Sequence, residues 1–249
     1  MGPRAKFRMT LSVTARHTWF TMAHSSTHPL PPADCRRILI VGAGGFGREV
    51  AEWARQTWPD HAHRLAGMLS EDTCCLAGTG CPLSIVGRPS DFEPAAGDYL
   101  LLGIGIPRVR RQVTEGLLAR GGRFLALAHP TAVIADSAQL GTGVVICPQA
   151  VVSVDTQVGD YAVLNYHTSL GHDASVGDYS VLSPYATLGG SATVGADVFI
   201  GMHATVGPRI SVGDRVVISA NSCALSCVPA DSLVYGVPGR SAPRIAPGM

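Results

Sequence analysis

The sequence has no run of about 18 apolar residues, the length that a helix needs to cross a membrane. Its mean hydropathy of +0.23 comes from dispersed Ala, Val and Gly instead. Charge is scarce as well, since 15% of the 249 residues are charged and the net charge is +1. A polyanion such as nucleic acid therefore has little to bind. These absences favour a soluble protein, without a membrane partner, that acts on small molecules.

Paired cysteine motifs are missing too. The seven cysteines lack the spacing of a zinc finger, and their odd number does not suit a framework of disulfides. We therefore expect reduced thiols and a cytoplasmic location. The length leaves room for two domains.

A period of six residues organises the second half of the chain. Every sixth residue from Ile134 to Ile218 is aliphatic, and glycine often follows it. This period is typical of a chain wound as a triangular prism, in which three hexads make one coil. The repeat predicts a left-handed parallel β-helix, which we assign to residues 129–249. Gly, Asp and Pro after the aliphatic position are expected to supply unusual backbone angles at the corners.

The other half opens with a strand, a glycine loop and a helix. Residues 38–41 are a short apolar strand, the loop GAGGFG follows, and an amphipathic helix is predicted over residues 48–56. The loop fits the G-x-G-x-x-G pattern, so backbone amides and a helix N-terminus are available for a phosphate. The loop residues that we expect to bind substrate are Gly42, Gly44, Gly45, Phe46 and Gly47.

The rest of this half completes a small α/β domain over residues 35–128. Its remaining elements are expected to be strands at 64–68, 84–86, 99–104 and 123–127, with a helix over 109–120. Such a half-Rossmann-like unit is too short for a dinucleotide but suits one mononucleotide, such as the nucleoside diphosphate of an activated sugar. Glu71 and Asp72 could meet a ribose or base there, although an exposed loop pair without a ligand explains them equally well.

Residues 1–34 differ from both halves. Four basic residues precede the first acidic one, Asp34, and prolines cluster at the end of the segment. We expect a disordered tail or a start codon placed too far upstream, with Met22 as a plausible start, and assign the segment no function.

Several motifs together resemble a known family. GAGGFGREV, a small α/β domain, HPTA, LNYHTSLGHD and YGVPGR occur here in the order seen in bacterial sugar acyltransferases. That family includes the sialic acid O-acetyltransferases and the N-acetyltransferases of nucleotide-linked amino sugars, and the similarity covers residues 36–245. The resemblance implies a nucleotide sugar on the N-terminal domain, a homotrimer, and acetyl-CoA in the cleft between neighbouring subunits.

The resemblance also implies residue roles. It makes His172 the general base, with Asp173 able to orient the ring, because imidazole suits proton transfer at neutral pH. Gly190 lies one coil beyond His172, where an unshielded N–H could face the thioester oxygen. The residues expected to contact acetyl-CoA are Gly189, Gly190, Gly207, Pro208 and Arg240, and Asn165 and His167 are expected to contact the acceptor.

Two other interpretations stay open. The corner residues Gln149, His167, Tyr185, His203 and Asn221 form a polar ladder. The β-helical carbonic anhydrases assemble zinc from histidines of adjacent subunits, and the spacing from His167 to His172 resembles theirs. However, His167 and His203 are two coils, or about 10 Å, apart, too far to share one metal in a subunit, so we expect no metal. The second alternative is a non-catalytic trimeric binding scaffold.

Overall fold

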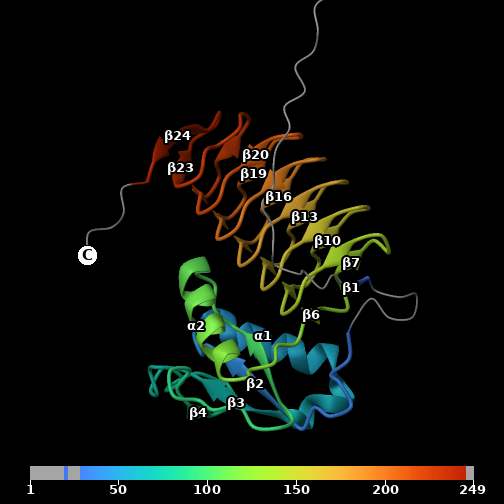
Figure 1. The fold of residues 1–249 in the computed structure, drawn as a ribbon, viewed down its shortest axis with the longest axis vertical. Helices are drawn as coiled ribbons and strands as arrows, with labels where there is room; N and C mark the ends of the chain where they lie inside the picture. Colours follow the sequence, from blue (N-terminus) through green and yellow to red (C-terminus); the bar gives the residue numbers. More distant parts are fainter. Residues whose placement is uncertain (1–19, 22–28, 245–249) are drawn as a thin grey trace, which may run out of the picture.

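The computed structural model describes residues 20–21 and 29–244, and it comprises an α/β domain and a parallel β-helix (Figure 1). The α/β domain contains a parallel sheet with the strand order β4-β3-β2-β5. Its elements are β2 (Arg37–Val41), α1 (Gly45–Thr57), η1 (Pro59–Arg64), β3 (Leu65–Leu69), β4 (Ile85–Gly87), β5 (Asp98–Leu102) and α2 (Pro107–Ala119). Neither α-helix in the described part of the chain is long and apolar enough to cross a membrane.

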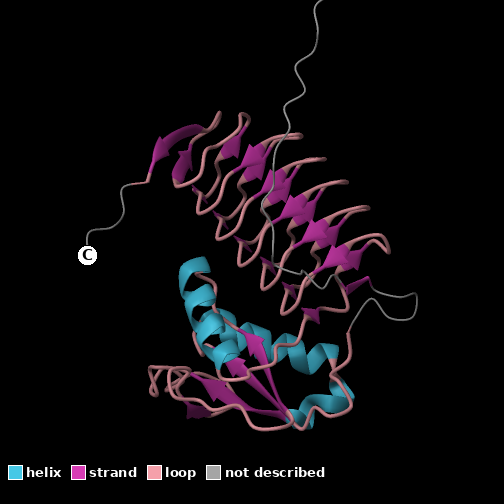
Figure 2. Cartoon of the chain, in the orientation of Figure 1, coloured by secondary structure: helices cyan, strands magenta, loops and turns pink. Residues whose placement is uncertain are grey.

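Helices cover both faces of this sheet, which explains why its central strands are apolar throughout. On one face Ile38 and Ile40 join a cluster with Val50 of α1. On the other face Leu39 packs with Leu117 of α2. Figure 2 shows that the long helices belong to this domain, while the rest of the described chain is strands and turns.

Three sheets form the faces of the β-helix. The first face contains β6 (Leu127–Ala128), β9 (Val145–Ile146), β12 (Val163–Leu164), β15 (Val181–Leu182), β18 (Phe199–Ile200), β21 (Val217–Ile218), β23 (Ser232–Tyr235) and β24 (Arg240–Pro243). The second face contains β7 (Val133–Ile134), β10 (Val151–Val152), β13 (Ser169–Leu170), β16 (Thr187–Leu188), β19 (Thr205–Val206) and β22 (Cys223–Ala224). The third face contains β1 (Phe20–Thr21), β8 (Gln139–Leu140), β11 (Gln157–Val158), β14 (Ser175–Val176), β17 (Thr193–Val194) and β20 (Ser211–Val212).

The hexad repeat builds the interior of this prism as predicted. Val152 pairs with Ile134 on one side and with Leu170 on the other, so aliphatic side chains stack at each coil. These residues belong to one continuous core with the small residues of the repeat, such as Ala150 and Ala186. The predicted β-helical fold class is confirmed.

Outward residues explain where the α/β domain sits. On the first face Val145, Val163 and Val181 point outward and join the cluster around α1. The third face carries polar residues at the same positions, such as Gln157 and Thr193. The first face therefore offers apolar surface along three successive coils, which the domain covers, whereas the third face does not.

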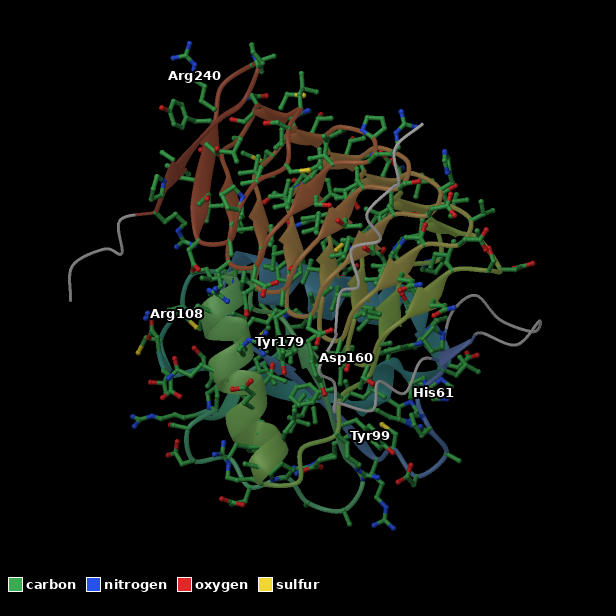
Figure 3. The ribbon with its side chains drawn as sticks, turned by 45° about the horizontal axis from the view of Figure 1, so that its top comes forward. His61, Tyr99, Arg108, Asp160, Tyr179 and Arg240 are labelled. Atoms are coloured by element: carbon green, nitrogen blue, oxygen red, sulfur yellow. The ribbon has the colours of Figure 1, made fainter. Side chains whose placement is uncertain are left out.

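One corner of the prism, between the third and first faces, also packs against the domain, and we call it the domain corner. Tyr161 and Tyr179 stack there with ring centroids 5.1 Å apart. Arg111 of α2 lies 4.1 Å from the ring centroid of Tyr179 and forms an ion pair with Asp197 at 2.7 Å. Figure 3 shows Tyr179 beside α2.

Left-handed backbone occurs at other residues than we predicted. From Leu140 to Ile218, positive φ falls three residues after each aliphatic position, and except at Gly143 these residues are not glycine, for example His167 and Asp173, both at 59°. The glycine that follows the aliphatic residue is needed for space instead. A Cβ on Gly171 would lie 2.6 Å from the backbone nitrogen of Gly190, and a Cβ on Gly141 would lie 2.6 Å from that of Asp160. Close approach of successive coils, and not a corner angle, selects glycine there.

The junction between the two halves also differs from the prediction. Residues 123–127 do not form a strand of the α/β sheet, because Phe124 makes only an isolated bridge to Leu100. The β-helix already begins at β6, which pairs with β9. The apolar residues just before His129 were predicted to be a strand of the α/β sheet, but Leu127 and Ala128 belong to the first face of the β-helix.

Most of the predicted N-terminal tail lies outside the described residues. Within residues 1–34, β1 pairs antiparallel with β8, and Pro29 accepts a hydrogen bond from Trp58 Nε1 at 2.8 Å. Asp34 forms an ion pair with Arg123 at 2.7 Å. The described residues 29–34 thus pack on the α/β domain.

Candidate active site

His172 lies on the corner between the second and third faces, which we call the His172 corner. Its side chain is 64% exposed, and Nδ1 is 2.6 Å from Oδ2 of Asp173. When Nδ1–H donates to this carboxylate, the lone pair remains on Nε2. Asp173 therefore selects the tautomer in which Nε2 can accept a proton.

Gly190 stacks against this ring one coil further along. A Cβ at Gly190 would lie 2.5 Å from His172 Nε2, so any side chain there would obstruct the nitrogen. The Gly190 carbonyl accepts a hydrogen bond from Arg209 N at 3.0 Å, whereas its own N–H has no acceptor among the described residues. Sequence reasoning placed Gly190 and His172 side by side, and the structure brings them together.

The free N–H of Gly190 belongs to a wider difference between corners that sequence reasoning missed. At the domain corner an aspartate caps the backbone N–H one coil earlier: Thr142 N donates to Asp160 at 2.7 Å, and Asp160 N donates to Asp178 at 2.8 Å. At the His172 corner the equivalent positions are held by His172 itself, Gly190 and Pro208, which offer no carboxylate. The signal was present as the interruption of the aspartate pattern. Its effect is to leave backbone donors available beside His172.

The residues expected to contact acetyl-CoA divide into two places. Gly189 and Pro208 continue the His172 corner, since a Cβ on Gly189 would lie 2.6 Å from Pro208 N, and Gly207 is buried beside them. Arg240 begins β24 in the terminal hairpin of the first face, opposite Tyr235. Figure 3 shows Arg240 at the end of the β-helix remote from the α/β domain. One chain therefore does not bring Arg240 to His172.

A stack of aromatic rings occupies the corner between the first and second faces, which we call the ladder corner. The ring centroids of His167 and Tyr185 are 4.6 Å apart, and those of Tyr185 and His203 are also 4.6 Å apart, with nearly parallel planes. Asn165 lies at the base of this corner, where its Oδ1 accepts a hydrogen bond from Tyr166 N at 2.8 Å. The ladder and the His172 corner are the two edges of the second face.

The glycine loop connects β2 to α1 at the carboxyl edge of the sheet. Gly42 has a φ of 99°. A Cβ on this residue would lie 2.9 Å from the Gly103 carbonyl oxygen, so the absence of a side chain lets the two segments approach. Gly44 and Gly45 have open space around them. The first turn of α1 holds no acidic residue, and no side chain caps its amides. The Gly42 N–H donates to Leu69 O at 2.8 Å, so the donors that the loop leaves available are those at the start of α1, from Gly44 through Phe46 to Gly47. They lie at a positive helix end.

Glu71 and Asp72 follow β3, next to β2 in the sheet, so they lie at the same edge as the glycine loop. Cys75 from this segment reaches the loop, with its Sγ 3.9 Å from the Ala43 carbonyl. Both carboxylates hold their own loops: Glu71 accepts hydrogen bonds from Ser90, and Asp72 accepts one from Cys74 N. Each is nevertheless exposed and keeps free acceptor capacity.

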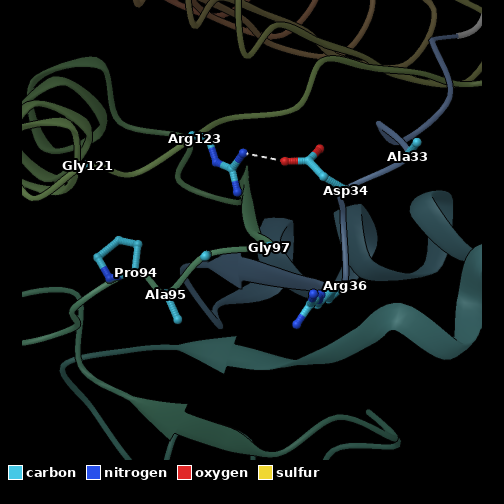
Figure 4. A pocket seen from close by; sticks show the side chains of 9 residues that line it. Ala33, Asp34, Arg36, Pro94, Ala95, Gly97, Gly121 and Arg123 are labelled. Atoms are coloured by element: carbon cyan, nitrogen blue, oxygen red, sulfur yellow. Dashed lines mark hydrogen bonds and ion pairs between the residues drawn. The ribbon is translucent and has the colours of Figure 1, made fainter.

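Two hollows in the described surface lie away from His172. One of about 490 Å³ lies at the amino edge of the sheet, beside the ion pair of Asp34 and Arg123 (Figure 4). Another, of about 620 Å³, lies between the start of α2 and Phe199 of the first face. Neither is lined by His172, so this histidine stands on an open edge of a single chain.

Metal binding has no support within one chain. Among the described residues no three His, Cys, Asp or Glu side chains are placed to hold an ion together. Tyr185 is stacked between His167 and His203, which keeps the two imidazoles apart. All seven cysteines are free thiols.

Comparison with known proteins agrees with this geometry. Residues 191–223 match the family model for the bacterial transferase hexapeptide with six repeats. UDP-N-acetylbacillosamine N-acetyltransferase of Bacillus subtilis is 30% identical over 117 residues, which are 45% of this chain and 51% of that protein. The chain spans about half the length of the curated relatives it matches.

Solved structures extend the likeness over both halves. PerB from Caulobacter crescentus, in complex with CoA and GDP-perosamine, is 25% identical with a TM-score of 0.73, covering 87% of this chain and all of that one. WeeI from Acinetobacter baumannii is 26% identical with a TM-score of 0.75, covering 83% of this chain and 99% of that one. The predicted resemblance is thereby confirmed, because the chain carries the hexapeptide repeat of bacterial transferases on the fold of N-acetyltransferases of nucleotide-linked amino sugars.

Proposed function

We propose that this protein transfers an acetyl group from acetyl-CoA directly to an amine, or less favourably a hydroxyl, of a nucleotide-linked sugar. The observation that carries the proposal is the pairing of His172 and Asp173 beside the unobstructed Gly190. The relatives support the substrate class, since one is named for a UDP-linked amino sugar and PerB was solved with CoA and GDP-perosamine.

The chemistry follows from the atoms at the His172 corner. The acceptor nitrogen attacks the thioester carbonyl carbon while His172 Nε2 takes the proton that the nitrogen loses. Asp173 holds Nδ1–H and stabilises the imidazolium that forms. The negative charge that develops on the carbonyl oxygen is stabilised by the Gly190 N–H. The C–S bond then breaks, and the sulfur takes the proton from the His172 imidazolium, so that CoA leaves as the thiol and the base is restored.

The acceptor is held by the α/β domain in this proposal. The N–H groups of the glycine loop face an open edge and suit the diphosphate, while Glu71 and Asp72 keep free acceptor capacity for a ribose or base. Asn165 and His167 lie at the ladder corner and would meet the sugar end.

A homotrimer completes the site in our proposal, because the exposed apolar surface of the β-helix is concentrated on one side. Between residues 127 and 230, the exposed large apolar side chains all lie on the second face or its two edges: Val133, Val151, Val154, Tyr185, Met202 and Leu225. If three copies turn this face toward a common axis, the His172 corner of one copy meets the ladder corner of the next. That arrangement encloses the open edge at His172.

The test is thiol release from acetyl-CoA in the presence of UDP-, GDP- and dTDP-linked amino sugars and their hydroxyl counterparts. We expect turnover with at least one amino sugar and none with the free nucleotides. Thiol release that is the same with and without every acceptor would contradict the proposal, as would activity lost on chelation and restored by zinc.

A further inference from the structure

Arg110 is a charged residue buried completely between the two halves of the molecule. Its exposed fraction is 0%, and no carboxylate pairs with it among the described residues. Instead, its guanidinium donates only to backbone carbonyls. Burial lowers the pKa of Arg110 to about 9, so the group is still protonated at neutral pH and all its N–H donors are present.

The carbonyl acceptors come from both halves. Nη1 donates to Leu102 O at 3.2 Å and to Ile104 O at 3.0 Å, at the end of β5. Nε donates to Tyr161 O, and Nη2 lies 3.5 Å from Gly143 O. Gly143 and Tyr161 occupy the same position of the domain corner in two successive coils. One guanidinium thus joins the β5–α2 loop to two coils of the β-helix.

The β5 end that Arg110 holds is also the support of the glycine loop. Gly103 lies between the two carbonyls bound by Arg110, and its N–H donates to Val41 O at 2.8 Å. A Cβ on Gly103 would lie 2.5 Å from the Cα of Gly47, and one on Gly42 would lie 2.9 Å from the Gly103 carbonyl. The backbones of Gly103, Gly42 and Gly47 are thus in close contact, so a displacement of Gly103 would displace the glycine loop as well.

We propose that Arg110 is a positioning residue that fixes the glycine loop relative to the β-helix, and so sets the place of the nucleotide-linked acceptor relative to the acetyl donor. The inference rests on the proposed function for its catalytic consequence. Arginine is required because its planar fork reaches carbonyls on both sides at once, whereas the single ammonium of lysine cannot span them. Arg110 itself touches no reacting atom.

The variants Arg110→Lys and Arg110→Met test this, with Arg37→Met as the matched control. Arg37 forms an ion pair with Asp98 at 2.7 Å on the same sheet, and the side-chain hydrogen bonds of Arg37 to described residues stay within the α/β domain. Because a misplacement of about 1 Å can cost on the order of 10²-fold, we expect kcat/KM for the acceptor to fall by that factor in both Arg110 variants. The KM for acetyl-CoA should stay unchanged, because its contacts are placed on the β-helix.

Amide hydrogen exchange supplies a readout that does not depend on turnover. We expect faster exchange in peptides covering residues 42–47 and 103–106 of the Arg110 variants, and unchanged exchange on the third face. The inference would be overturned if Arg110→Lys had the same kcat/KM for the acceptor as Arg37→Met and the same rate of exchange in the glycine-loop peptides. If the unmodified protein acetylates no sugar, the proposed function fails, while the exchange comparison still decides whether Arg110 holds the loop. Should Arg110→Met not fold, Arg110→Lys carries the test alone.

Discussion

His172 and Asp173 show how an ordinary corner of a repeat becomes a reactive one. Asp173 has a left-handed backbone, which turns its carboxylate back toward the ring of the preceding residue. His172 contributes little to packing, since most of its side chain is exposed. Chemistry and folding are therefore separable at this position.

We predict that His172→Ala lowers kcat by roughly 10² to 10⁴, the range for loss of a general base. The free energy of unfolding should change by no more than about 0.5 kcal/mol, as for other surface substitutions. Steady-state kinetics and urea unfolding measure the two effects.

The matched control is His63→Ala, which removes an exposed histidine of η1 in the α/β domain. It should leave kcat unchanged. If His172→Ala kept most of the turnover at neutral pH, the mechanism that we propose would be wrong.

At the scale of an element, each strand from β6 to β22 has only two residues, so the stability of these coils comes from the stacked interior. Leu170 is 1% exposed and lies between Val152 and Leu188 of the adjacent coils. Its neighbour Ser169 points outward and bonds Thr187 across the surface.

Leu170→Ala should therefore destabilise the protein by about 2 to 5 kcal/mol, through lost burial and the cavity that remains. Chemical denaturation gives this value. Ser169→Ala, in the same strand, is the comparison, and we expect a change of less than about 1 kcal/mol because a single partly exposed hydrogen bond is lost. Equal losses in both variants would show that the interior does not dominate the stability of the coil.

The hexads could be predicted from the sequence because an aliphatic residue every sixth position has one structural meaning. The corners could not, because a left-handed residue leaves no fixed side-chain signature: His167, Asp173 and Tyr185 all adopt it. The pairing of Gly190 with His172 followed from the period of the repeat. The role of Arg110 did not, since its acceptors are backbone carbonyls from distant parts of the chain, which any sequence could supply.

At the scale of the whole molecule, the three faces have different tasks. The first face is covered by the α/β domain, and the third is polar. The second face carries exposed valines between the two corners that hold His172 and the aromatic ladder. Its surface is the one whose burial would favour association.

We predict that Val151→Glu, on the second face, shifts the protein from three chains to one in sedimentation at micromolar concentration. Burying three like charges near a common axis is unfavourable, which is the physical reason. The control is Gln157→Glu on the third face, which should leave the mass unchanged. A single-chain mass for the unmodified protein, or a trimer that tolerates Val151→Glu, would rule out association through this face.

The pairing of residues eighteen apart, such as Asp160 with Asp178, restricts how the length of this chain can change during evolution. Removing one hexad before His172 would rotate everything after it by a third of a turn. His172 would then occupy the ladder corner, and the terminal hairpin would leave the first face. Insertions and deletions are therefore compatible with this architecture only as whole coils, or as loops that bulge from a corner and return to it.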